Sequence, residues 1–105
     1  MQVTRQVTIT GSTFYANATA MIKRLKPGDT LKLLREPQLK YDTNAVAVYL
    51  PSTVGGDKQL GYCPRGLAAE LAPLMDAGTV VAAVRARTAL EGVMTLTWDD
   101  GTIKE

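Results

Sequence analysis

The segment from Arg35 to Asn44 holds the densest group of polar side chains in the sequence, and Tyr41 and Asp42 are adjacent within it. Such a pair presents an aromatic face beside a carboxylate acceptor. This combination suits a nucleobase together with its sugar hydroxyl, and stacking on an aromatic side chain contributes about 1–3 kcal/mol per base. The segment therefore predicts a surface that binds the end of a nucleic acid.

Two other interpretations of these side chains stay open. Asp42 and Asn44 are turn-forming residues that commonly bond to their own backbone, and Arg35 can pair with Glu36 on the surface at under about 1 kcal/mol. Glu36 and Asp42 could instead act as paired carboxylates in a hydrolase, by general acid–base catalysis. No nucleophile or metal-binding cluster accompanies the two acids, so a hydrolase is the least favoured function.

A second group, GYCPR at residues 61–65, predicts a strand that runs directly into a helix. The first amides of a helix lack acceptors within it and lie at the positive end of its dipole. Arg65 in the first turn is unfavourable there, and an anion bound nearby would offset this. A side chain that simply reaches solvent explains Arg65 equally well. Cys63 is expected to be a small buried hydrophobic residue rather than a nucleophile.

A third group is Phe14-Tyr15, which follows the first expected strand. The strand's alternation and the ordinary burial of phenylalanine place Phe14 in the core, and they send Tyr15 to the opposite side.

The composition excludes several classes of protein. The 105 residues include 12 Lys or Arg, 10 Asp or Glu, one Cys and no His. The single cysteine and the lack of histidine exclude a zinc site of Cys and His ligands. They also exclude Ser–His–Asp or Cys–His catalysis and an internal disulfide. The apolar runs are too short to cross a bilayer, and the amino end lacks the apolar core of a signal peptide. We expect one domain over residues 1–105, without cofactor or metal, in the cytoplasm.

The charge is unevenly distributed. The net charge is only +2, which argues against broad, non-specific coating of DNA. Residues 1–40 nevertheless carry seven Lys or Arg against two acidic residues, a net +5, so a local basic patch can form.

The elements that must position these groups follow from hydrophobic periodicity and turn residues. Asn17 is expected to cap the first helix, and Pro73 should kink the second or end it early. The second helix has a stripe of leucines for burial, at Leu67, Leu71 and Leu74. The pattern predicts strands at 2–10, 30–35, 45–50, 58–63, 79–88 and 93–98, a turn at 99–101 before 102–104, and helices at 17–26 and 64–76.

The fold class expected from this order is all-β to α+β. About six strands in hairpin order would close into a small OB-like or SH3-like barrel, with one main helix and one short helix.

Several of these segments together resemble the HIRAN domain. They are the run from Gly11 to Tyr15, GDTLKLLREP at 28–37, YDTNAVAV at 41–48, LGYCPR at 60–65 and LAAELAPLMDAG at 67–78. The resemblance covers about residues 8–85. The family occurs fused to fork-remodelling DNA translocases and as short stand-alone bacterial proteins, and this chain is similar to the stand-alone form because it has no helicase motif or Walker loop.

The resemblance implies roles for individual residues. In the fused members the domain is an OB-like barrel that captures single-stranded DNA at a free 3′-hydroxyl end. Tyr15 and Tyr41 would stack on the terminal bases, and Asp42 would accept the 3′-hydroxyl. Arg65 would bind a phosphate where the family can have Lys, and Tyr62 would line the pocket where DNA-binding members can have His.

Three further residues would support this site: Phe14, Arg35 and Asn44. Phe14 departs from the family pattern, in which DNA-binding members can have Arg before the aromatic residue, so one phosphate contact is lost.

The function expected is a non-catalytic module for single-stranded DNA or DNA 3′ ends, with a DNA-processing protein as a further candidate partner and no membrane. The alternative is a protein-interaction or assembly module on the same barrel. The sequence leaves the oligomeric state open.

Overall fold

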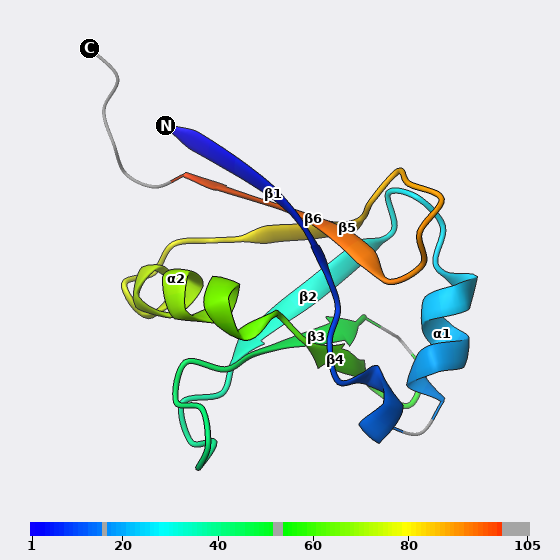
Figure 1. Cartoon of the computed structure of the whole chain (residues 1–105), viewed down its shortest axis with the longest axis horizontal. Helices are drawn as coiled ribbons and strands as arrows, with labels where there is room; N and C mark the ends of the chain where they lie inside the picture. Colours follow the sequence, from blue (N-terminus) through cyan, green and yellow to red (C-terminus); the bar gives the residue numbers. More distant parts are fainter. Residues whose placement is uncertain (16, 52–53, 100–105) are drawn as a thin grey trace.

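The computed structural model describes residues 1–15, 17–51 and 54–99. Within these residues the expected six strands and two α-helices are confirmed, and one short 3-10 helix, η1, lies between the first strand and the first α-helix (Figure 1). In chain order the elements are β1 (Gln2–Thr8), η1 (Ser12–Phe14), α1 (Ala18–Arg24), β2 (Thr30–Arg35), β3 (Val46–Leu50), β4 (Lys58–Tyr62), α2 (Arg65–Asp76), β5 (Ala82–Arg85) and β6 (Val93–Asp99).

All strand pairs are antiparallel, in the order β1-β6-β5-β2-β3-β4. Strand β2 belongs to both halves of the sheet, because its first two residues pair with β5 and residues 32–35 pair with β3. A sheet that changes partners along one strand curls strongly, as OB-like barrels do. The expected barrel class is confirmed.

The two outer strands of this sheet meet at a bridge between Thr10 and Tyr62. The amide of Thr10 donates to the carbonyl of Tyr62 at 2.9 Å, and the amide of Tyr62 donates back at 2.8 Å. The Thr10 hydroxyl adds a bond of 3.1 Å to the same carbonyl. The barrel is therefore closed at one point, just beyond β1, rather than along a full pair of strands.

Gly61 makes this closure possible. Its φ is +152°, and a Cβ at this position would overlap the carbonyl oxygen of Thr10 and lie 2.9 Å from Ile9 Cγ2. A residue without a side chain is needed where two backbones approach this closely.

The core follows the alternation seen in the sequence. Ile9 is buried and Val3 and Val7 are partly buried, as the period-2 pattern of residues 2–10 predicts. The largest fully buried side chains are Leu60, Leu71, Met94, Leu96, Val46 and Val48.

Helix α2 packs against β2 and β3 with Leu71 fully buried, while Leu67 and Leu74 are partly buried against the core. The expectation that Pro73 ends this helix early is wrong, because α2 continues to Asp76. Proline removes one backbone hydrogen bond and crowds the preceding turn. Here Pro73 is exposed in the last third of the helix, and the burial of its neighbours Leu71 and Ala72 holds the helical backbone in place.

Helix α1 is shorter than expected, and Asn17 does not cap it through its side chain. Asn17 has a left-handed backbone, with φ 64°, and its side chain makes no capping bond. A capping residue normally has an extended backbone, from which its side chain reaches the free amides.

The strand expected at 79–88 is reduced to β5, residues 82–85. Its first part belongs to the end of α2, because the amide of Thr79 donates to the carbonyl of Leu74 at 2.9 Å. Beyond β5 the chain turns into a loop, so Arg85 is buried while Arg87 is exposed. The alternation of a strand over 79–88 predicts that Arg85 and Arg87 share one face, and this prediction is wrong. The turn expected at 99–101 lies mostly outside the described residues, and the segment 102–104 that follows it lies wholly outside them.

Replacing Gly61 by alanine should break the barrel closure. We expect Gly61→Ala to lower the free energy of unfolding by roughly 1–3 kcal/mol or more, because the added methyl group overpacks against Thr10 and Ile9. Chemical denaturation measures this. Gly66→Ala is the matched control, since no atom lies within 4 Å of a Cβ there, and alanine in a helix gains up to about 1 kcal/mol over glycine. Equal effects of the two substitutions would contradict the closure argument.

Candidate functional site

The loop between β2 and β3, residues 36–45, is closed at its base by its own backbone. The amide of Glu36 donates to the carbonyl of Ala45 at 3.0 Å, and the amide of Ala45 donates to the carbonyl of Asp42 at 3.2 Å. Asp42 Oδ1 also accepts the amide of Asn44 at 3.0 Å. The turn-forming interpretation of Asp42 is confirmed, and Asn44 contributes through its backbone while its side chain is exposed.

Arg35 ties this loop to the end of α2. Its guanidinium forms a bidentate salt bridge with Asp76: Nε donates to Oδ1 at 2.9 Å, and Nη2 donates to Oδ2 at 3.2 Å. It also donates to the carbonyls of Ala45 at 2.9 Å and Thr43 at 3.0 Å. The expected surface pair with Glu36 is therefore wrong, because the planar fork of Arg35 satisfies four acceptors elsewhere. The hydrogen bonds from Arg35 lower the pKa of the Asp76 carboxyl.

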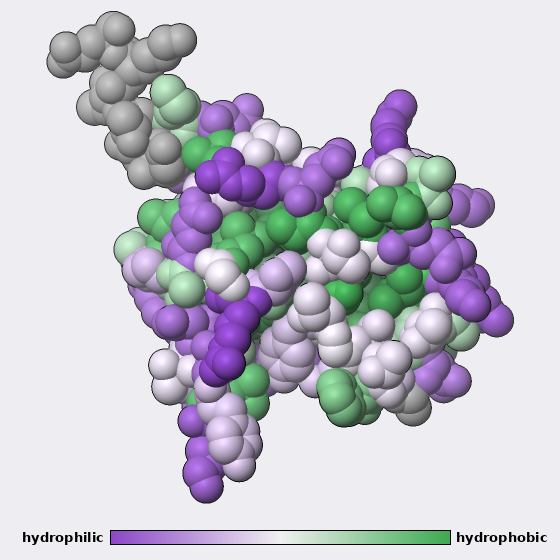
Figure 2. Space-filling model, viewed as in Figure 1, coloured by the Kyte–Doolittle hydropathy of each residue, from purple (hydrophilic) through white to green (hydrophobic). Residues whose placement is uncertain are grey.

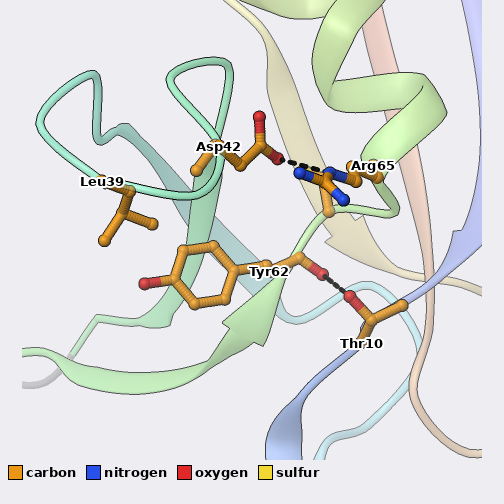
Figure 3. A pocket seen from close by; sticks show the side chains of 7 residues that line it. Thr10, Leu39, Asp42, Tyr62 and Arg65 are labelled. Carbon is orange, nitrogen blue, oxygen red and sulfur yellow. Dashed lines mark hydrogen bonds and ion pairs between the residues drawn. The ribbon is translucent and has the colours of Figure 1, made fainter.

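Arg65 ties the same loop to the beginning of α2. Its Nη2 donates to the carbonyl of Tyr41 at 2.6 Å, and its Nε lies 3.6 Å from Asp42 Oδ2 (Figure 3). The side chain nevertheless stays 76% exposed. The loop is thus fastened at both ends of one helix, which holds Asp42 and Arg65 side by side.

A pocket of about 250 Å³ opens between this loop, β4 and the start of α2 (Figure 3). Asp42 and Arg65 lie along one side of it, and the ring of Tyr62 extends beneath the loop toward Leu39. A carboxylate, a guanidinium and an aromatic face thus converge on one space. The lining residues are Thr10, Leu39, Asp42, Ala45, Tyr62, Cys63 and Arg65.

Tyr15 extends this aromatic surface. Its ring centroid lies 6.2 Å from that of Tyr62, with the planes tilted by 48°. Burial raises the pKa of the Tyr15 hydroxyl, and its hydrogen bond with Tyr62 and the negative charge of Glu36 raise it further. Tyr15 therefore keeps its proton at neutral pH, and its uncharged ring lies beside that of Tyr62.

The other two aromatic residues expected at this site, Tyr41 and Phe14, are exposed to solvent. Tyr41 is 84% exposed, does not line the pocket, and has Lys40 Nζ 5.9 Å from its ring centre. The aromatic neighbour of Tyr15 is thus Tyr62 rather than Tyr41. Phe14 is 86% exposed, so the expectation that it lies in the core is wrong. The left-handed turn at Gly11 ends the alternation of the strand and starts η1, which buries no side chain.

Comparison with known proteins decides the family. The model of the HIRAN domain matches residues 3–95. The chain belongs to the HIRAN domain family.

Solved structures show the same fold as this HIRAN domain. A protein from Lactobacillus plantarum superposes with a TM-score of 0.72 at 24% sequence identity, over 93% of this chain and 97% of that one. The HIRAN domain of human HLTF superposes with a TM-score of 0.65, also at 24% identity, over 92% of this chain and 74% of that one. No curated protein matches the chain.

The carboxylates of this HIRAN domain do not form the pair that a hydrolase would use. Asp42 lines the pocket and Glu36 does not, and Glu36 Oε1 is buried without a hydrogen-bond partner. In residues 1–15, 17–51 and 54–99, no three His, Cys, Asp or Glu side chains lie close enough to hold a metal ion. Burial raises the pKa of Cys63 to about 12, which leaves its thiol protonated and unreactive.

Sequence reasoning missed four residues that line the pocket: Thr10, Leu39, Ala45 and Cys63, the last of which was expected only to be buried. A local signal exists for Leu39, the one large aliphatic side chain in the polar loop at residues 36–45. Thr10 carried no such signal, because it reaches the pocket through the barrel closure. No helix in the part of the chain that the structure describes is long and apolar enough to cross a membrane.

The pair between Arg35 and Asp76 should make stability depend on pH in a defined window. The pKa of Asp76 is lower in the folded protein than the value of about 3.9 expected when unfolded. The pair therefore stabilises the fold fully above that unfolded value, and the contribution is lost as the pH falls through the lower folded value. Asp76→Asn should be destabilising at about pH 7 and progressively less so toward about pH 2, measured by urea unfolding.

A double-mutant cycle checks the cause. In an Arg35→Gln background, Asp76→Asn should no longer have this pH-dependent effect. If Asp76→Asn lowers the free energy of unfolding equally at about pH 7 and at about pH 2, the charge pair does not hold the loop.

Proposed function

We propose that this HIRAN domain is a non-catalytic module that captures single-stranded DNA at a free 3′-hydroxyl end. Membership of the family supports nucleic-acid binding. The observation that carries the proposal is the convergence of Asp42, Arg65 and the Tyr62 ring on one pocket. A hydroxyl, a phosphate and a base are the three parts of a nucleotide end that these side chains complement.

The hydroxyl is assigned to Asp42 Oδ2. The other oxygen of this carboxylate already accepts the amide of Asn44, whereas Oδ2 faces Arg65 at the longer distance of 3.6 Å. A 3′-hydroxyl can donate to Oδ2 without disturbing the turn. The adjacent phosphate then pairs with the exposed guanidinium of Arg65, where charge assistance strengthens the hydrogen bond.

The terminal base is assigned to Tyr62 and Tyr15. Tyr62 lines the pocket, and the Tyr15 ring lies beside it with its centroid 6.2 Å away. The rings of Tyr41 and Phe14 are exposed and can stack on a second base. The terminal base therefore stacks on Tyr15 and Tyr62 in this proposal, whereas the family resemblance implies stacking on Tyr15 and Tyr41.

Selectivity follows from charge and from the fastened loop. A 3′-phosphate would place negative charge against Asp42, which repels it. If an internal nucleotide occupied the pocket, the rest of the strand on its 3′ side would collide with the loop at residues 36–45. Arg35 and Arg65 hold this loop against α2. The site therefore favours a free end over an internal segment.

The charge of Asp42 should set the preference for the 3′ end. We expect the wild type to bind an oligonucleotide with a free 3′-hydroxyl more tightly than the same oligonucleotide with a 3′-phosphate, by fluorescence anisotropy. Asp42→Asn should shrink this preference, because asparagine keeps the turn but removes the negative charge. Glu70→Gln is the matched control, as it removes a carboxylate that pairs with Arg5 rather than with the loop. Equal binding of both oligonucleotides by the wild type would exclude end capture.

The ring of Tyr62 should supply stacking energy independently of its hydroxyl. Tyr62→Ala should weaken binding of the free-ended oligonucleotide by about 1–3 kcal/mol, and Tyr62→Phe should retain most of the affinity. Both substitutions keep the backbone bonds to Thr10, and thermal melting verifies the fold. An unchanged affinity in Tyr62→Ala would remove the ring from the site.

A protein-interaction module is the second candidate, and the exposed rings of Phe14 and Tyr41 favour it. Two large aromatic side chains in solvent are suited to a partner surface. Absence of DNA binding at low salt, in a protein that melts cooperatively, would favour this candidate over DNA capture.

A further inference from the structure

Three cations gather at α1: Lys23, Arg24 and, just beyond the helix, Lys26. All three are exposed. Within the described ranges, none of their side chains forms an ion pair or hydrogen bond. We refer to these three residues as the α1 basic surface.

Most of the other exposed or half-exposed cations are paired. Arg5 lies 3.5 Å from Glu70, and Lys32 lies 3.1 Å from Asp57. Arg35 and Arg65 pair with Asp76 and Asp42 as described above. The α1 basic surface therefore concentrates positive charge that no carboxylate in the described part of the chain neutralises.

The burial of α1 explains why these charges face outward. Ala18 and Ile22 are its buried residues, one turn apart on one face, and Leu25 continues the burial past the helix end. The helix contains no acidic residue. The nearest acid in sequence, Asp29, uses its Oδ2 to accept the backbone amide of Lys26 at 2.8 Å.

The α1 basic surface is connected to the pocket through the aromatic residues. Tyr62 lines the pocket and contacts Tyr15, which directly follows η1. The 3-10 helix in turn packs against both β4 and α1. Figure 1 shows the loop at residues 36–45, η1 and α1 in this order from left to right along the lower part of the molecule. Hydrophilic side chains project from the edge at α1 in Figure 2.

We propose that the α1 basic surface binds phosphates of the same DNA strand, on the 5′ side of the end held in the pocket. This inference rests on the proposed function. A strand whose 3′ end is captured can leave the pocket only in its 5′ direction. Tyr15 contacts Tyr62 at the pocket and follows η1, which packs against α1, so this route runs toward α1. Charge complementarity selects the occupant, because the backbone of single-stranded DNA is a regular row of negative charges and the three cations have no competing carboxylate partner among the described residues.

The test compares a short and a long ligand with the same free 3′ end. A trinucleotide fills the pocket and its aromatic platform, whereas an oligonucleotide of about 12 residues, within the roughly 4–16 that OB folds cover, also reaches α1. The variant is Lys23→Gln/Arg24→Gln/Lys26→Gln. We expect it to bind the long oligonucleotide roughly ten-fold or more weakly at about 50 mM salt, and to bind the trinucleotide as the wild type does.

The salt dependence gives a second readout of the same contacts. Each phosphate contact to a single strand contributes about 0.7 to the slope of log affinity against log salt concentration. For the long oligonucleotide, the triple variant should lower the magnitude of this slope by about 2. For the trinucleotide, the slope should stay unchanged.

A matched variant separates local contacts from overall charge. Arg5→Glu/Val80→Glu lowers the net charge by the same amount, at two exposed positions on the α2 side of the barrel. We expect the control to retain the affinity for the long oligonucleotide. Equal weakening by both variants, or no weakening by the α1 variant, would overturn the inference.

The two proposals fail in different ways. If the wild type prefers a free 3′-hydroxyl over a 3′-phosphate but the α1 variant binds the long oligonucleotide normally, the α1 inference is wrong and end capture stands. If the wild type shows no such preference while the α1 variant still loses the long oligonucleotide, end capture is wrong and α1 stands as a DNA contact.

Discussion

The backbone bridge between Thr10 and Tyr62 is the contact on which the site depends. It joins the chain after β1 to the end of β4, and it can form because Gly61 has no side chain to separate the two backbones. Closure at this point has three consequences. It makes Thr10 a wall of the pocket, it places the Tyr62 ring beneath the loop at residues 36–45, and it starts the turn that brings Tyr15 beside that ring. A different register at this bridge would move all three groups together.

A second constraint comes from arginines that join the loop to α2. Arg35 reaches Asp76 near the end of the helix, and Arg65 reaches Tyr41 and Asp42 from its beginning. The acidic side chain proposed to accept a hydroxyl is therefore held by its turn and by its neighbouring guanidinium before any ligand binds. Preorganisation of this kind reduces the entropy that binding must overcome. The two oxygens of Asp42 divide these roles, because Oδ1 accepts the amide of Asn44 in the turn and Oδ2 is the atom proposed to accept the ligand hydroxyl.

Much of the fold could be predicted because it is local. Strand β2 has the bounds that its alternation indicates, and α2 begins beside Pro64, as the residue pattern requires. The errors arose where a turn or a tertiary contact overrides the local pattern. Phe14 is exposed because the left-handed backbone at Gly11 ends the alternation on which its predicted burial depended. The strand expected at 79–88 is short because Thr79 completes the end of α2.

The sequence by itself determined the order of strands and helices, the turns, the buried faces and, through its motifs, the resemblance to the HIRAN domain. These properties depend on neighbours a few residues apart, where sterics and hydrophobic periodicity act. Only the tertiary structure decided the partners of the charged and aromatic side chains: Asp76 for Arg35, Tyr62 for Tyr15, and no carboxylate for the α1 basic surface within the described residues. The physical reason is that each charge has many possible partners along the chain, and the closed barrel alone determines which of them comes within a few ångströms.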